Sequence, residues 1–147
     1  MNNNTIRVGE IRLVSFDQHS TRHVLVREVY DTHCVAMLLH PYLELATASD
    51  FLLTREATGL PYQLVVQTDI VGCLREFQFV SSPLDSNIKV LATVSLDFIN
   101  IGNECGSALA GILDLRWSFK QSEGRQWQQI TETTNALLLG IAQKGGK

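Results

Sequence analysis

The chain has 147 residues, enough for one domain, or for one small domain with an extension, and too few for two full hydrophobic cores. Hydrophobic residues make up 45% of it, as in an ordinary globular protein, and charged residues only 18%. The formal net charge of -3 and the lack of a Lys/Arg run argue against a protein that binds by neutralising many duplex phosphates. A small site that holds one or two phosphates stays compatible with this composition.

The cysteines and the first residues bear on the compartment. Cys34, Cys73 and Cys105 are an odd number at wide spacing, which predicts no disulfide framework and favours a reducing compartment. The opening Met-Asn-Asn-Asn-Thr lacks the basic and apolar regions of a signal peptide. No apolar stretch approaches the roughly 18 uncharged residues that a membrane span requires. We therefore expect a cytoplasmic protein without membrane contact.

Short apolar runs in the first eighty residues predict β-strands. The first run opens at Ile6–Val8, bends at Gly9 and continues to Phe16, and the others cover His23–Val29, Cys34–Leu39, Phe51–Leu53, Tyr62–Thr68 and Cys73–Val80. Pro41 ends the third run, Tyr42–Asp50 is expected to be an irregular loop, and the last two runs are joined near Gly72. Five or six short strands with tight connections favour a closed barrel or half-barrel, which removes exposed strand edges.

The pattern changes at Ser82. Ser82-Pro83-Leu84-Asp85 is a helix-capping signature, and apolar residues then recur at steps of three or four, which predicts a helix from Pro83 to about Phe98. After a connector with several glycines, a second helix is expected to start near Asp114. Its apolar stripe consists of Trp117, Trp127, Leu138 and Ile141, with Gly124, Thr131 and Thr134 on the same face. The predicted fold class is therefore α+β, with a small antiparallel β-barrel in residues 1–81 and a packed helical extension in residues 82–147.

Several segments of the first half resemble the MazF/PemK family of toxin proteins. The opening Val8-Gly9-Glu10-Ile11-Arg12-Leu13-Val14-Ser15-Phe16-Asp17 is similar to that family's first strand, and Thr21-Arg22-His23-Val24-Leu25-Val26 resembles its second. Gly59-Leu60-Pro61-Tyr62, followed by Val65-Val66-Gln67-Thr68-Asp69-Ile70, resembles its later turn and strand. The resemblance covers roughly Val8 to Val80 and implies a CcdB/PemK-type SH3-like barrel that is generally dimeric.

The resemblance implies a metal-independent endoribonuclease that acts on single-stranded RNA and is neutralised by an antitoxin, with no cofactor. The alternative is a catalytically inactive relative that binds and inhibits or regulates a cellular protein. Three departures from the family pattern lie at positions where these toxins act: His23 stands where the family has Pro, His40 stands where it has Thr or Ser, and the basic loop is reduced to Gln18-His19-Ser20. The acidic net charge, the missing basic loop and the additional helices favour the alternative. A homodimer is expected from the family in either case.

Metal-free cleavage of RNA requires a base, an acid and a cation, and three residues are candidates for these roles. Arg22 can pair its planar guanidinium with phosphate oxygens, or it is a surface arginine at the start of a strand. His40 can transfer a proton near neutrality, or it caps a strand before Pro41. Asp69 can orient Arg22 or His40, or it is an acidic turn residue.

Further candidates surround these three. The residues expected to hold RNA are His19, His23, Gln67 and Thr68. Trp117 and Trp127 lie ten residues apart, on nearly one helix face, which packs on the barrel or anchors a protein partner. No spacing of His and Cys predicts a metal site.

Overall fold

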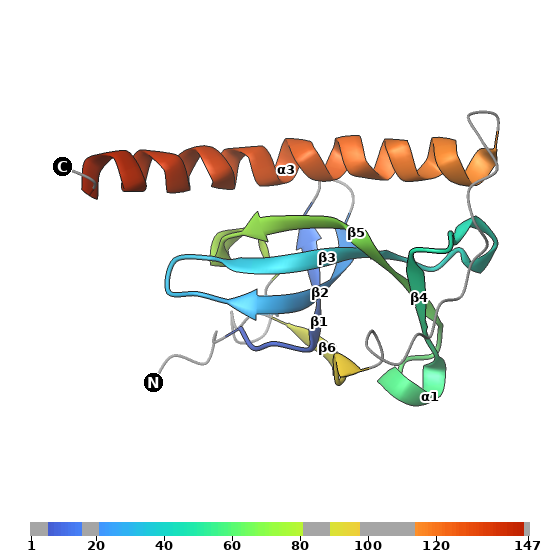
Figure 1. The fold of residues 1–147 in the computed structure, drawn as a ribbon. Coiled ribbons are helices and arrows are strands. Elements are labelled where there is room, and N and C mark those ends of the chain that lie inside the picture. Colours follow the sequence, from blue (N-terminus) through green and yellow to red (C-terminus); the bar gives the residue numbers. More distant parts are fainter. Residues whose placement is uncertain (1–5, 16–20, 81–88, 98–113, 146–147) are drawn as a thin grey trace.

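The computed structural model describes residues 6–15, 21–80, 89–97 and 114–145. These residues form an α+β fold, in which a six-stranded antiparallel sheet curls into a half-barrel beside one long helix (Figure 1). The sheet order is β4-β5-β3-β2-β1-β6, with β1 at Glu10–Ser15, β2 at Thr21–Val29, β3 at Cys34–His40, β4 at Asp50–Leu53, β5 at Leu64–Leu74 and β6 at Val90–Thr93. Helix α1 covers Arg55–Thr58 and α3 covers Leu115–Gly145.

The predictions for the first four strands are confirmed to within a few residues. Antiparallel ladders join β1 to β2 and β2 to β3, and the second ladder has a register shift between Val26 and Glu28. The predicted turn at residues 58–61 is the end of α1, where Thr54 caps the first turn by accepting the Ala57 amide hydrogen and Gly59 ends the helix at a φ of 79°. The predicted irregular loop contains a short 3-10 turn at Leu43–Leu45.

The predicted break at Gly72 is wrong. β5 runs without interruption from Leu64 to Leu74 and pairs with both β3 and β4, and the segment after it forms a 3-10 turn at Glu76–Gln78 instead of more strand. Gly72 has a different function. A Cβ at this position would lie 2.7 Å from Trp127 Nε1 and even closer to the Thr131 methyl group, so the missing side chain lets α3 approach the strand.

The predicted helix from Pro83 to Phe98 is also wrong where the chain is described. Val90–Thr93 is strand β6, which pairs antiparallel with β1, and α3 is the one long helix of the described residues. The segment Val90–Leu96 is too short for its apolar residues to distinguish the helical period of 3.6 from the strand period of 2. The edge of β1 offers hydrogen-bonding partners that a strand can use and a helix cannot. Because β6 belongs to the sheet, the sheet extends beyond the predicted boundary at residue 81.

The two sides of the sheet carry two separate hydrophobic clusters. Alternation along each strand divides them, so that Leu25 of β2 points into the barrel and its neighbours Val24 and Val26 point toward α3. The barrel interior contains Ile11, Leu25, Met37, Leu39, Phe51, Leu53, Leu64 and Val66. The other cluster contains Val14, Val24, Val26, Cys34, Ala36, Leu38, Ile70, Leu74, Phe79 and Trp127. Cys34 is thus a buried apolar residue, as expected, and burial raises the pKa of its thiol to about 12.

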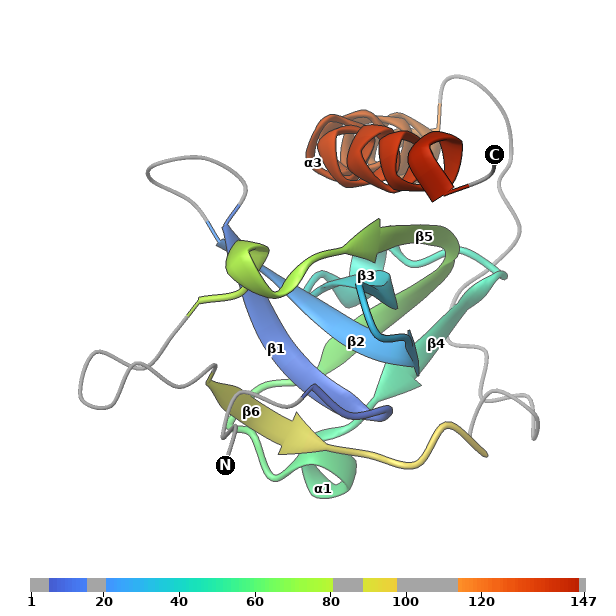
Figure 2. The same cartoon turned by 90° about the vertical axis from the view of Figure 1, so that its left-hand side faces the viewer.

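Helix α3 confirms the prediction of a helix near Asp114. Its first turn is held by the Asp114 carboxylate, which accepts the Arg116 amide hydrogen at 2.8 Å. Figure 2 shows α3 nearly end-on above β5 and β3, with β6 and α1 at the bottom of the view, away from this helix. We call the side of β2, β3 and β5 under this helix the helix-facing side. Among the described residues, no helix combines the length and apolar character needed to cross a membrane.

Candidate functional site

Arg22, His40 and Asp69 come from three different strands and meet one short stretch of α3. Arg22 Nη1 of β2 lies 3.1 Å from a carboxylate oxygen of Glu123. The ring of His40, the last residue of β3, contacts the ring of Phe119 edge to face, with 4.8 Å between the centroids. Asp69 of β5 forms an ion pair of 2.7 Å with Lys120. All three candidates therefore contact α3 between Phe119 and Glu123, and Asp69 does so through a separate partner, Lys120.

Arg22 is held by two side chains of α3. Besides the ion pair with Glu123, its Nη2 donates a hydrogen bond of 2.9 Å to the Gln126 side-chain oxygen. The Glu123 side chain is only 2% exposed, whereas that of Arg22 is 27% exposed. Burial raises the pKa of Glu123, and this effect is opposed by Arg22, Gln67 and Lys120. The Arg22 guanidinium is therefore already paired with a carboxylate of α3.

His40 is buried and neutral. Its Nδ1 accepts the Tyr42 amide hydrogen at 3.1 Å, so the ring proton resides on Nε2. Burial, followed by the positive charges of Lys120 and Arg22, lowers the pKa of His40 to about 4. The expectation that His40 transfers protons near neutrality does not hold in this arrangement. Its Nε2–H has no hydrogen-bond partner among the described residues and can donate to an anionic oxygen.

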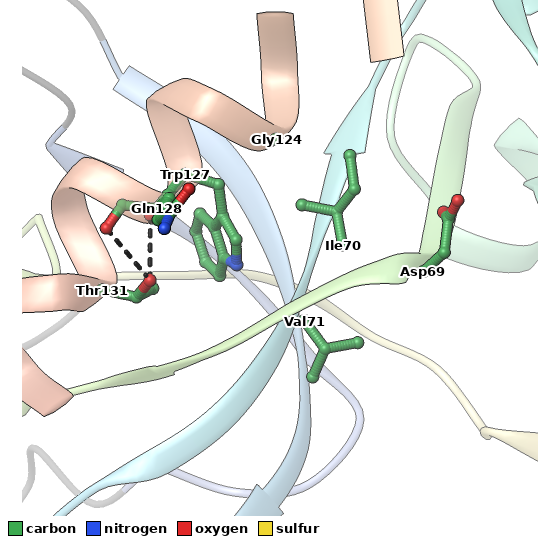
Figure 3. Close-up of a pocket in the computed structure, with 7 residues that line it drawn as sticks. All are labelled: Asp69, Ile70, Val71, Gly124, Trp127, Gln128 and Thr131. Atoms are coloured by element: carbon green, nitrogen blue, oxygen red, sulfur yellow. Dashed lines mark hydrogen bonds between the residues drawn. The ribbon is translucent and has the colours of Figure 1, made fainter. Parts of the chain in front are cut away.

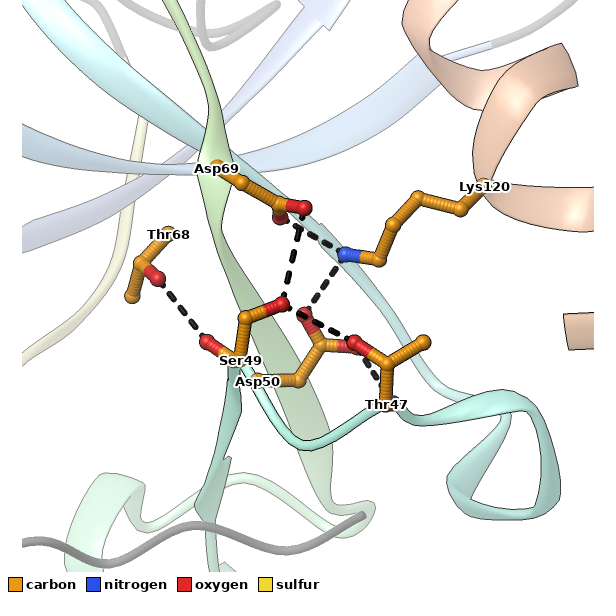
Figure 4. Close-up of polar contacts among 6 residues, drawn as sticks. All are labelled: Thr47, Ser49, Asp50, Thr68, Asp69 and Lys120. Atoms are coloured by element: carbon orange, nitrogen blue, oxygen red, sulfur yellow. Dashed lines mark hydrogen bonds and ion pairs between the residues drawn. The ribbon is translucent and has the colours of Figure 1, made fainter. Parts of the chain in front are cut away.

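Asp69 belongs to a separate polar cluster (Figure 4). Lys120 Nζ lies 2.7 Å from both Asp69 Oδ1 and Asp50 Oδ1, and the Asp50 side chain is fully buried. The other oxygen of Asp50 accepts the Thr47 amide hydrogen at 2.9 Å. Asp69 also accepts a weak hydrogen bond of 3.5 Å from the Ser49 hydroxyl. Asp69 is therefore positioned to fix Lys120, and its contacts do not include the Arg22 or His40 side chains that it was expected to orient.

The candidates for RNA binding are dispersed. Gln67 is fully buried on the helix-facing side near Glu123. Thr68 donates a hydrogen bond of 2.8 Å to the Ser49 carbonyl oxygen (Figure 4). His23 alternates with Arg22 along β2 and contacts the Tyr62 hydroxyl at 2.9 Å, and burial lowers its pKa. His19 lies outside the described residues. Of the three that the structure describes, only Gln67 lies beside a side chain that pairs with Arg22, namely Glu123.

Trp127 packs on the sheet. It is 3% exposed and belongs to the cluster with Ile70 and Phe79, while Trp117 is half-buried. Of the two alternatives for the tryptophan face, packing on the barrel or anchoring a protein partner, Trp127 follows the first. Beside it, a pocket of about 300 Å³ opens between β5 and α3 (Figure 3). Its walls are Asp69, Ile70, Val71, Gly124, Trp127, Gln128 and Thr131.

Sequence reasoning missed the part of the site that α3 contributes. Lys120, Glu123 and Gln126 recur at steps of three, and together with Trp127 they mark the side of α3 that meets the sheet. The spacing alone could have shown that these residues share one side of α3. It could not show which strand residues they contact, because Arg22 and Glu123 are 101 residues apart in sequence.

Comparisons with known proteins add no identity to this geometry. No protein-family model matches the chain, and no curated protein is significantly similar to it in sequence. Within the described ranges, no group of three or more His, Cys, Asp or Glu side chains lies close enough to hold a metal ion.

Proposed function

We propose that this chain is a PemK/MazF-like toxin-family protein whose helix-facing side binds single-stranded RNA and cleaves it without a metal. The observation that supports this best is the convergence of Arg22 and His40. They come from the ends of two adjacent strands, and both contact successive turns of α3, His40 at Phe119 and Arg22 at Glu123 and Gln126. A cluster of buried ionisable groups on one side of a sheet is a candidate functional site on physical grounds.

In the proposed reaction, the 2′-oxygen of the ribose attacks the phosphorus, and the bond from phosphorus to the 5′-oxygen breaks. A base takes the proton of the 2′-hydroxyl, and an acid returns a proton to the leaving 5′-oxygen. Arg22 is assigned to the phosphoryl oxygens, because its planar fork matches them and stabilises the charge that builds there. His40 is assigned to proton transfer once its burial is relieved.

A second function is favoured by a specific observation. Glu123 already pairs with Arg22, Lys120 already pairs with Asp69, and His40 is neutral and covered by Phe119. These contacts suit a catalytically inactive relative that binds and regulates a cellular protein. The proposal of an RNA-cleaving toxin also includes a cytoplasmic location, a homodimer and an antitoxin partner.

Inducible expression in a bacterium separates the two functions. An RNA-cleaving toxin should arrest growth and fragment cellular RNA, Arg22→Ala should abolish both effects, and the purified protein should cut single-stranded RNA in EDTA. The matched control is Arg27→Ala, which changes an exposed arginine of the same strand and should stay fully toxic. Growth arrest with intact RNA would support the binding function and refute the RNase.

A further inference from the structure

We propose that α3 is a built-in cover of the RNA site: the segment from Phe119 to Gln126 occupies the helix-facing side, and Glu123 takes the position of an RNA phosphate on Arg22. This inference rests on the proposed function of that surface. It assigns a regulatory state to the same site, because RNA can reach Arg22 and His40 only after α3 has moved.

Charge complementarity is the first argument. The sheet presents a cation, Arg22, and two carboxylates, Asp50 and Asp69, and the helix meets them with Glu123 and Lys120. Carboxylates and phosphates are alternative partners of a guanidinium and use the same planar geometry. Arg22, which would attract RNA, and Asp50 and Asp69, which would repel it, are thus each paired with an opposite charge of α3.

The polar character of the contact is the second argument. Glu123 and His40 are each 1% exposed, and the His40 Nε2–H has no hydrogen-bond partner among the described residues. Burying such groups costs free energy that well-packed apolar residues would not cost. Contacts within a chain that are more polar than a core resemble transient interfaces, for which relative motion is the usual expectation. The polar composition of residues 119–126 therefore favours local opening of this stretch of α3, while Trp127 packs in the apolar cluster of the helix-facing side.

Detachment would also change the chemistry of the site. Burial is the main reason for the low pKa of His40, with Lys120 and Arg22 as smaller causes. Two of the groups that face the ring, Phe119 and Lys120, leave with the helix. Opening therefore breaks the contacts of Arg22 with Glu123 and Gln126 and returns His40 toward an imidazole that exchanges protons near neutral pH.

Two variants of the full-length protein weaken the cover without touching Arg22 or His40. Gly72→Val places a side chain where Trp127 and Thr131 now lie, so α3 must shift. Glu123→Gln removes the carboxylate that pairs with Arg22. The matched controls are Gly124→Ala, whose added Cβ would meet nothing within 4 Å, and Gln129→Lys, which changes the net charge by the same amount as Glu123→Gln at an exposed position of α3.

Two measurements report on opening and on RNA separately. The first is the rate at which diethyl pyrocarbonate modifies His40 at neutral pH, measured by peptide mass spectrometry with His33 of the β2–β3 hairpin as internal reference. The second is the affinity for a fluorescent 2′-O-methyl single-stranded oligoribonucleotide, which cannot be cleaved by 2′-hydroxyl attack. Gly72→Val overpacks the contact between β5 and α3, so it should raise the His40 modification rate and the RNA affinity by about 5- to 150-fold. Glu123→Gln should raise the same two quantities.

The outcomes separate the inference from the proposed function. Faster His40 modification with tighter RNA binding in both variants, and in neither control, supports both. Faster modification without RNA binding supports a detachable helix but overturns the proposed function of the surface. Unchanged His40 reactivity in both variants overturns the cover. Loss of RNA cleavage in Glu123→Gln without faster His40 modification also overturns it, because Glu123 would then act as the general base.

Discussion

Buried and neutral His40 predicts a specific loss of stability in acid. A histidine in the unfolded chain gains its proton near pH 6.5, whereas burial keeps His40 neutral in the folded chain until about pH 4. Between these values the unfolded state binds more protons than the folded state, so the free energy of unfolding falls as the pH falls. The difference between the two pKa values of His40 corresponds to about 3 kcal/mol of unfolding free energy. The free energy of unfolding should fall by about 2 kcal/mol of this amount between pH 7 and about pH 4.5.

The assay is urea unfolding at the two pH values for the wild type and for His40→Asn, whose side-chain oxygen can replace Nδ1 as the acceptor of the Tyr42 amide hydrogen. On acidification, the free energy of unfolding of His40→Asn should fall by about 2 kcal/mol less than that of the wild type. Other groups also contribute, since burial lowers the pKa of His23 and raises that of Glu123, but they contribute to both proteins. His33→Asn controls for the removal of a histidine as such. Equal losses in wild type and His40→Asn would refute the burial of His40 under α3.

Three further predictions concern packing. Trp127→Ala should lower the free energy of unfolding by about 3–5 kcal/mol, because the indole is 3% exposed, and Trp117→Ala should cost clearly less in the same urea titration. Gly72→Ala should lower the free energy of unfolding by about 1–3 kcal/mol, because its Cβ would lie 2.7 Å from Trp127 Nε1 and 3.1 Å from the Thr131 Cβ. Gly9→Ala should destabilise the protein by at least about 1 kcal/mol, because its φ of 89° suits glycine and the added Cβ would collide with the Val94 carbonyl oxygen.

Each of these packing predictions has its own contrary result. Equal losses for the two tryptophans would place α3 in a different rotation about its axis. Gly72→Ala is compared with Gly124→Ala, whose added Cβ would meet nothing within 4 Å. Equal unfolding midpoints for these two variants would contradict the close approach of α3 to β5. An unchanged unfolding midpoint for Gly9→Ala would contradict the close approach of β6 to the start of β1.

Most of the sheet could be predicted from the sequence because its strands obey local rules. Runs such as Cys34–Leu39 are apolar, rich in β-formers and followed by Pro41, and these features act over a few residues. Two predictions were wrong because the deciding interaction is not local. Gly72 looked like a turn, but it lies within β5 because Trp127 requires the space of its missing side chain. Val90–Thr93 fitted a helical period, but the edge of β1 makes it a strand.

The candidate site could be predicted in part for the same reason. Arg22 and His40 were proposed from a resemblance in the strands, and the sheet places both on its helix-facing side. Their partners on α3 could not be predicted, because a helical spacing shows which residues share a side and not which strand they meet. The low pKa of His40 follows from that contact as well, since it requires the burial by Phe119 and the charge of Lys120.

A double-mutant cycle between Arg22 and Glu123 tests most directly whether α3 covers the site. The free energy of unfolding is measured for the wild type, Arg22→Ala, Glu123→Ala and the double variant. Because Glu123 is almost fully buried and Arg22 mostly so, the account predicts a coupling of about 1–2 kcal/mol, above the roughly 0.2–1 kcal/mol of exposed pairs. Additive losses, with no coupling between the two residues, would contradict the position of α3 over Arg22.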